Sequence, residues 1–248
     1  MDRRHILTGG LALGASLALP ALARAGSVQA DPLHADPLLA DPLWGEFDKT
    51  FGQTSEPVVT AESLAPLLPT YAAPDPAYDR KVLAIAQREV QKAGSVVWRR
   101  DIVGVADFAR PSSLPRFHFA NLESGTIRSF YVAHGRGSDH EHDGWLKNFS
   151  NVVGSEATSR GAYLTAEWYH GKYGTSIRLL GLDGDNSTAL DRAIVMHPAA
   201  YASPTWIEKY GKLGRSEGCF AMAPDQFNEA LWHLSGGRLL FADRIGEG

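Results

Sequence analysis

The sequence contains a single cysteine, Cys219, among its 248 residues. A protein that uses sulfur for covalent stability needs cysteines in pairs, so the class of small disulfide-stabilised secreted folds is excluded. An unpaired thiol is then either a small buried side chain or a group with chemistry of its own.

The sequence also lacks any block of Lys and Arg, and its formal net charge is -4. Nucleic acid and anionic membrane surfaces are therefore poor candidate partners, because both bind through clustered positive charge. Beyond the N-terminus no apolar run approaches the ~18 residues that a membrane span needs, so we expect no transmembrane segment.

The N-terminus has the pattern of an export signal. Arg3 and Arg4 precede an apolar stretch at 6–22, and Ala23-Arg24-Ala25 gives the small-x-small cleavage pattern. We predict a signal peptide over residues 1–25, exported by either the twin-arginine or the general secretory route. Its removal would change the formal charge to about -6.

A proline-rich segment follows the predicted signal. Residues 30–43 contain Ala-Asp-Pro-Leu three times, one copy every five residues. Proline at this spacing interrupts both helices and strand ladders, so we predict a linker or strap over 26–75.

The rest of the chain predicts one mainly β domain. A helix is expected over 76–96, with Asp75 as its cap, Pro76 in its first turn and Gly94 as its stop signal. Seven short apolar runs between 100 and 244 have strand composition, and a second helix is expected after Pro224. Many short strands with few helices favour a β-sandwich or open barrel over 97–248.

Cys219 follows Gly218 on a stretch that reads as a tight loop. Gly218 permits unusual dihedrals, Ser216 is a turn former, and Arg215 is a nearby cation that favours a thiolate. The local residues leave two interpretations open, a nucleophile and a buried filler.

A thiol nucleophile needs a base, and nine histidines are available. His197 is the candidate we prefer, because it ends the apolar run "AIVMH" and is followed by Pro198, at a strand end that enters a loop. His233 lies among apolar residues of the late helix, where a packing role is expected.

A second polar stretch, "HGRGSDHEHDG", competes as a functional site. His134, His140 and His142 could supply three imidazoles to zinc and leave a water position open. No His-Glu-x-x-His helix motif accompanies them, so we favour a solvated loop with no metal, in which His134 contacts substrate.

Two motifs resemble a known family. "VAHGRGS" at 132–138 and "GRSEGC" at 214–219, in this order and separated by a histidine strand, are similar to motifs in a divergent branch of the L,D-transpeptidase catalytic domains of YkuD type. The resemblance covers about 97–245. It implies an exported, periplasmic cysteine enzyme with a mainly β fold, which remodels peptidoglycan stem peptides without metal or cofactor.

The resemblance also implies roles for individual residues. Cys219 would be the nucleophile and His197 the general base, while Ser216 and Gly218 would shape the loop. Backbone N–H groups at Gly218 and Cys219 would form the oxyanion hole.

This sequence departs from the common family pattern at three positions: Glu217 and Ala221 replace a usual His and Arg, and Pro198 replaces a Gly. We therefore expect Arg215, His134 and Arg136 to hold the stem-peptide carboxylate instead.

The family implies acyl transfer to a diaminopimelate amine. The donor bond is either diaminopimelate to D-alanine, which gives 3,3 links, or L-alanine to D-glutamate, which gives 1,3 links. The missing usual substrate contacts favour the 1,3 product. Water as acceptor would make the protein an L,D-carboxypeptidase, and a non-enzymatic wall-binding module and a zinc hydrolase are the remaining alternatives.

Overall fold

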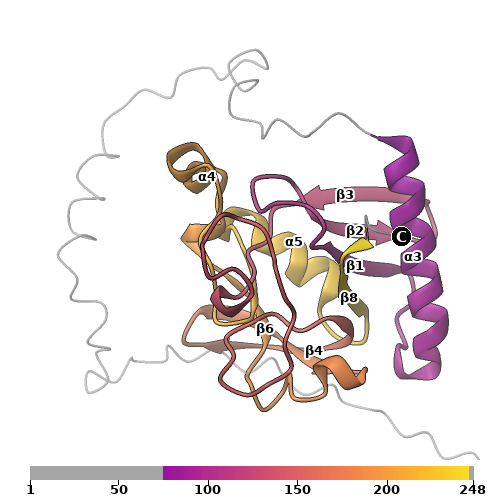
Figure 1. Ribbon diagram of the computed structural model, residues 1–248. Helices are drawn as coiled ribbons and strands as arrows, with labels where there is room; N and C mark the ends of the chain where they lie inside the picture. The colour runs from indigo at the N-terminus through magenta and orange to yellow at the C-terminus, as the bar shows by residue number, and fades with distance from the viewer. Residues whose placement is uncertain (1–74, 246–248) are drawn as a thin grey trace, which may run out of the picture. The chain divides into compact units, whose positions relative to one another are not determined.

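Figure 1 shows the computed structural model, which describes residues 75–245. The predicted signal peptide and nearly all of the predicted linker lie outside the described residues and stay predictions. Both motifs and the histidine strand lie within the described residues, because they fall between 132 and 219.

Helix α3, Pro76–Ala93, begins and ends where its caps predict. The Asp75 carboxylate accepts hydrogen bonds from the N–H groups of Ala77 (2.9 Å) and Tyr78 (3.2 Å). Gly94 closes the helix with a φ of 62°, which a residue with a Cβ rarely adopts. A short 3-10 turn, Gly94–Val96, completes the predicted 76–96 segment.

A single eight-stranded mixed sheet forms the centre of the described part of the chain. Its spatial order is β3-β2-β1-β8-β4-β5-β6-β7, with parallel pairs β1/β8 and β6/β7 and antiparallel pairs elsewhere. The strands are β1 Ile102–Asp107, β2 Phe117–Asn121, β3 Thr126–Phe130, β4 Gly161–Gly171, β5 Gly174–Gly181, β6 Val195–Pro198, β7 Phe220–Met222 and β8 Leu239–Asp243.

The sheet curls around helix α5, Pro224–Leu234. One buried cluster joins α5 to side chains from both ends of the sheet, including Phe130 of β3 and Met222 of β7. The opposite face packs against α3, through Val82, Ile85, Ala86 and Val90, as Figure 1 shows on the β1, β2 and β8 side. The prediction of an open barrel with packed helices is confirmed, and the sheet is a half-barrel.

Two short elements were not predicted. Helix α4, Pro204–Tyr210, has no buried residue and begins at a proline, with Gly211 in the left-handed conformation at its end. Strand β7 has only three residues. Cys219 immediately precedes this strand.

Candidate active site

Cys219 immediately precedes β7, level with the start of the neighbouring parallel strand β6, because Phe220 pairs with Met196. Its side chain is 7% exposed, and its thiol donates to the carbonyl oxygen of Ala193 at an S–O distance of 3.6 Å. The thiol is therefore nearly enclosed, and its acceptor Ala193 lies two residues before β6, the strand that carries His197. The burial alone is compatible with both the buried-filler and the nucleophile interpretation.

The β6/β7 ladder brings His197 beside the strand that Cys219 precedes. His197 pairs with Ala221 across the β6/β7 ladder, and Cys219 precedes Ala221 by two residues. The histidine strand and the Cys219 loop are therefore neighbours in the fold.

The His197 ring is held in one tautomer by its own backbone neighbour. Its Nδ1 atom lies 3.0 Å from the carbonyl oxygen of Pro198. A carbonyl only accepts, so Nδ1 carries the proton and Nε2 of the neutral ring is left as a proton acceptor.

The tip of the β4–β5 hairpin covers this ring. Tyr173 stacks on His197 with centroids 4.5 Å apart and an interplanar angle of 25°. His197 is 2% exposed, and burial lowers its pKa against the smaller opposing effect of the Pro198 carbonyl.

The pKa of Cys219 moves in the opposite direction. Burial raises it most, and the negative charge of Glu217 raises it further. The backbone N–H of Val195 and the positive charge of Arg192 lower it. Both shifts favour the uncharged forms, so the resting pair is a thiol and a neutral imidazole.

Gly218 shapes the loop before the thiol. Its φ is 112°, and an added Cβ would lie 2.8 Å from the carbonyl oxygen of Ala157. The Ser216 hydroxyl donates to the Cys219 carbonyl at 2.7 Å and accepts from the Gly218 N–H at 3.2 Å. Of the two predicted oxyanion donors, the one at Gly218 is thus engaged within the loop.

The predicted "VAHGRGS" motif packs directly against the Cys219 loop. An isolated parallel bridge joins Gly135 to Ser216, and an antiparallel bridge joins Ala133 to Ala221. A Cβ added to Gly135 would lie 2.7 Å from the backbone nitrogen of Gly218. The two motifs are therefore in contact, and the missing Cβ of Gly135 permits the close approach of the Gly218 backbone.

His134 is buried and contacts two charged side chains of the protein. It is 1% exposed, and its Nδ1 lies 2.6 Å from the Arg116 guanidinium and its Nε2 3.3 Å from the Asp139 carboxylate. Burial and the positive charge of Arg116 lower its pKa to about 4, against the opposing effect of Asp139. The ring links the motif to Arg116 and Asp139, and in this conformation neither ring nitrogen is free to bind a substrate.

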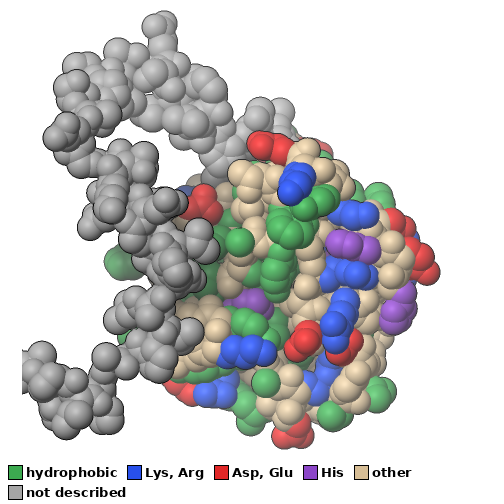
Figure 2. Space-filling model, turned by 90° about the vertical axis from the view of Figure 1, so that its left-hand side faces the viewer, with side chains coloured by type: hydrophobic (Ala, Val, Ile, Leu, Met, Phe, Trp, Pro, Cys, Tyr) green, Lys and Arg blue, Asp and Glu red, His purple; other side chains and the backbone are tan. Residues whose placement is uncertain are grey.

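Arg136 and Arg215, the other two predicted substrate contacts, are more accessible. The Arg136 side chain is about half exposed and forms an ion pair with Glu156, with Glu217 a further 3.7 Å from its guanidinium. Arg215 donates to the carbonyl of Asp139 and, at 3.4 Å, to that of His140. Figure 2 shows a face on which Lys and Arg are interspersed with acidic and hydrophobic side chains.

Backbone strain is concentrated around this site. The non-glycine residues with positive φ in the described chain are His142, Glu156 and Ala193. Ala193 accepts the Cys219 thiol, and the His142 ring contacts the carbonyl of Leu213 at 3.0 Å. Strained backbone of this kind costs of order 1–3 kcal/mol and tends to collect at functional sites.

Three residues near the thiol were not identified from the sequence, namely Tyr173, Arg192 and Tyr201. Tyr201 packs on Gly214, and its pKa is raised by burial and then by the charges of Cys219, Tyr173 and Glu217. Each of the three comes from a loop or turn, where residue pattern carries little positional information. The repeated glycines around Tyr173, "GKYG", were the available signal for a hairpin tip.

No metal centre is formed by the side chains of residues 75–245, where three or more His, Cys, Asp or Glu never converge suitably. The three histidines considered for zinc differ in environment, with His134 buried against Arg116 and His142 directed to a backbone carbonyl. Within the same residues, none of the helices has both the length and the apolar character needed to span a bilayer.

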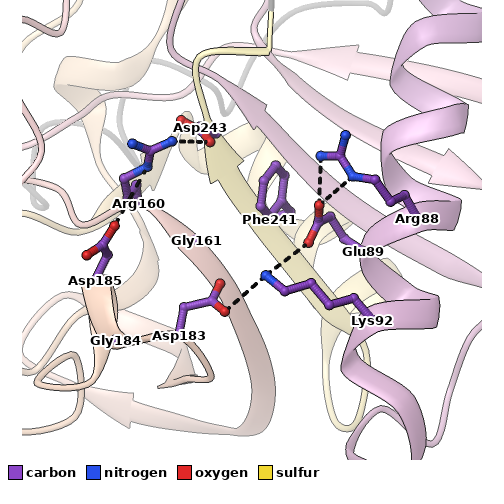
Figure 3. A pocket seen from close by; sticks show the side chains of 10 residues that line it. All are labelled: Arg88, Glu89, Lys92, Arg160, Gly161, Asp183, Gly184, Asp185, Phe241 and Asp243. Carbon is purple, nitrogen blue, oxygen red and sulfur yellow. Dashed lines mark hydrogen bonds and ion pairs between the residues drawn. The ribbon is translucent and has the colours of Figure 1, made fainter. Parts of the chain in front are cut away.

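A separate hollow of about 540 Å³ lies between α3, the start of β4, the turn after β5 and the end of β8 (Figure 3). Its walls are charged, but Lys92 pairs with Asp183 at 3.2 Å and Arg160 with Asp243 at 2.7 Å. Its lining contains neither histidine nor cysteine. The hollow therefore offers no nucleophile, and the Cys219 region remains the candidate site.

Comparison with known proteins agrees with the fold. The family model for the L,D-transpeptidase catalytic domain (YkuD_2) matches residues 75–242. The comparison with curated proteins gives no match.

The solved structures found by comparison have low sequence identity to this chain. An L,D-transpeptidase from Mycobacterium smegmatis is 15% identical, with a TM-score of 0.34 and 58% of each chain covered. An L,D-transpeptidase in complex with imipenem is 13% identical, with a TM-score of 0.35 and coverage of 58% of this chain and 59% of that one. The helical cell shape determining protein of Campylobacter jejuni is 12% identical, with a TM-score of 0.37 and coverage of 66% and 56%. The chain thus spans less than two thirds of the length of each of these structures.

Proposed function

Because the chain belongs to the L,D-transpeptidase catalytic domain family, we propose that it is a cysteine acyltransferase that cross-links peptidoglycan stem peptides outside the cytoplasm. The observation that carries this proposal is the parallel β6/β7 ladder, which pairs His197 with Ala221, two residues after Cys219. The histidine is already in the tautomer that a general base needs.

The first half-reaction forms a thioester. Nε2 of His197 takes the thiol proton as Sγ of Cys219 attacks the carbonyl carbon on the L side of an L-to-D peptide bond. The tetrahedral oxyanion is stabilised by the backbone N–H of Cys219, with that of Gly218 available if its bond to Ser216 opens. Collapse breaks the C–N bond, and the departing amine leaves with the proton from His197.

The second half-reaction transfers the acyl group. The side-chain amine of a diaminopimelate residue attacks the thioester carbonyl and gives a proton to His197. The C–S bond breaks, and the sulfur regains that proton to restore the neutral pair. Water in place of the amine would give a carboxypeptidase product.

We propose the 1,3 link, from L-alanine to diaminopimelate, as the main product. Glu217 and Ala221 stand where the common family pattern has other residues, so donor recognition differs from that pattern. Arg136 and Arg215 are the accessible cations of the two motifs, and we assign them to the stem-peptide carboxylates in place of His134.

The test is incubation of purified protein with defined muropeptides, followed by mass-spectrometric sequencing of the products. We expect dimers from the wild type, and loss of dimers in Cys219→Ser and His197→Gln. His233→Gln is a matched control, because this histidine packs on Phe119 at a centroid distance of 5.1 Å, in another part of the molecule. Activity that survives in Cys219→Ser would refute the proposed nucleophile.

One observation favours a second candidate, a wall-binding module without catalysis: Cys219 is 7% exposed. Intact mass after exposure to a carbapenem separates the two functions. An adduct that is present on the wild type and absent from Cys219→Ala supports the enzyme, whereas muropeptide binding without any adduct supports the module.

A further inference from the structure

Arg192 lies in a turn shortly before β6 and donates hydrogen bonds to residues of the segment 150–159. Its Nη1 donates to the Ser150 carbonyl at 2.7 Å and to the Ser159 hydroxyl at 2.6 Å. Its Nη2 donates to the Ala157 carbonyl and, at 3.3 Å, to the Ser155 hydroxyl. The guanidinium is therefore fixed in position, since its plane is bonded on two sides.

The same guanidinium lies against the Cys219 loop. A Cβ added to Gly218 would be 3.2 Å from Nη2 of Arg192 and 2.8 Å from the Ala157 carbonyl that this nitrogen binds. Gly218 is bonded directly to Cys219, so the fixed positive charge of Arg192 lies beside the residue that precedes the thiol. Burial of the site strengthens the interaction between this charge and the sulfur, because little water remains to screen it.

Other charged or titratable groups face the thiol from several elements. Glu217 of the loop, Tyr201 of the turn after β6 and Tyr163 of β4 each interact electrostatically with Cys219. His197 lies on the neighbouring strand β6. Arg192 is the cation among them, and it opposes the combined effect of burial and Glu217 on the pKa of the thiol.

We propose that Arg192 is a positioning residue for the Cys219 thiolate: it holds the 150–159 segment under the loop and places a positive charge beside the sulfur. This assignment rests on the proposed function of Cys219 as the nucleophile. It predicts that charge and geometry can be separated by substitution. Glutamine keeps hydrogen-bonding groups without charge, and lysine keeps charge without the planar fork.

The experiment measures alkylation of Cys219 by iodoacetamide between pH 6 and pH 10, by intact mass. The readout is specific because the chain has one cysteine. We expect Arg192→Gln to react about tenfold more slowly than wild type at pH 7.5, with the difference disappearing at high pH, because thiolate formation limits the rate. Arg192→Lys should retain most of the wild-type pH profile.

Arg128→Gln is the matched control, since Arg128 lies on β3 at the opposite end of the sheet, where it forms an ion pair with Glu229 and lies over the Phe130 ring. Thermal unfolding of each variant reports whether the fold is kept. An unchanged pH midpoint in Arg192→Gln overturns the proposal. The proposal is also overturned if the pH profile of Arg192→Lys is shifted from that of wild type as far as the profile of Arg192→Gln. If Arg192→Gln does not fold, a shift of the Arg192→Lys profile away from that of wild type overturns it.

Wild-type protein that is alkylated normally but forms no muropeptide dimers would count against the proposed function alone. The effect of Arg192 on the thiol would then still be measured. The two hypotheses therefore fail in different assays.

Discussion

Replacing Gly135 with alanine should separate loss of activity from loss of fold. The Cβ of Gly135→Ala would lie 2.2 Å from the Glu156 carbonyl oxygen and 2.7 Å from both the nitrogen and the Cα of Gly218. These neighbours are backbone atoms, so no side-chain rotation relieves the contacts.

The size of the required movement follows from these distances. The Glu156 carbonyl must retreat by about 0.8 Å merely to restore a separation of 3.0 Å. Overpacking of this kind typically costs about 1–3 kcal/mol of stability. In a chain of this size the melting temperature would fall by about 2–4 °C for each kcal/mol.

Activity should fall much further than stability, because Gly218 precedes Cys219 directly. A displacement approaching 1 Å at a reacting group can cost roughly 100-fold in rate. We expect such a loss in carbapenem acylation and muropeptide cross-linking, measured at a temperature where the variant remains folded.

Gly184→Ala is the matched control for this variant. No atom lies within 4 Å of the position of its added Cβ, and its φ is in the ordinary range. Its acylation rate should equal that of wild type. If Gly135→Ala folds and is acylated within twofold of the wild-type rate, the inferred coupling between the two motifs is wrong.

Two further predictions concern protonation. Tyr173→Ala should expose the His197 ring. Because burial lowers the pKa of this histidine, its pKa should then rise toward the ordinary value. NMR titration of the histidine measures this pKa, and an unchanged value would contradict the role of the stacked tyrosine. Burial lowers the pKa of His118 to about 3 and, together with Arg116, that of His134 to about 4. Both folded-state values lie below the unfolded value near 6.5, so the free energy of unfolding should fall as the pH drops from about 6.5 toward 3–4, by up to about 1.4 kcal/mol per pH unit for each histidine. Urea unfolding at stepped pH measures this slope, and a His118→Gln variant should have a shallower one.

The sequence predicts helices well where caps and apolar spacing agree. Asp75 and Gly94 mark both ends of α3, and Pro224 begins α5. Helix α4 escaped prediction because its seven residues bury nothing, although Pro204 and Gly211 mark its ends.

The order of the strands in the sheet cannot be predicted from the local residue pattern of each strand. β1 pairs in parallel with β8, so that Val103 lies beside Leu239, and a strand composition says nothing about such a distant partner. The same limit applies to Arg192, whose partners on segment 150–159 precede it by more than thirty residues.

The fate of His134 shows how motif position and role can differ. The sequence places this residue beside the proposed site and suggests a substrate contact. The structure gives both ring nitrogens to Arg116 and Asp139, which only the packed protein can supply. The neighbouring Gly135 is the residue of the motif that lies against Gly218, where an added Cβ would be 2.7 Å from the Gly218 nitrogen.

The protonation of the resting site constrains how the thiol can react. Burial raises the pKa of Cys219 and lowers that of His197, so a stable thiolate–imidazolium pair is disfavoured in this conformation. Proton removal must then accompany attack on the substrate, which requires Nε2 of His197 to face the sulfur during the reaction. The Val195 N–H and Arg192 lower the cost of the negative charge that develops on sulfur at that moment, while Glu217 raises it. A positively charged group of the incoming substrate near Glu217 would cancel this opposition, so binding and activation of the nucleophile would be coupled through one exposed carboxylate.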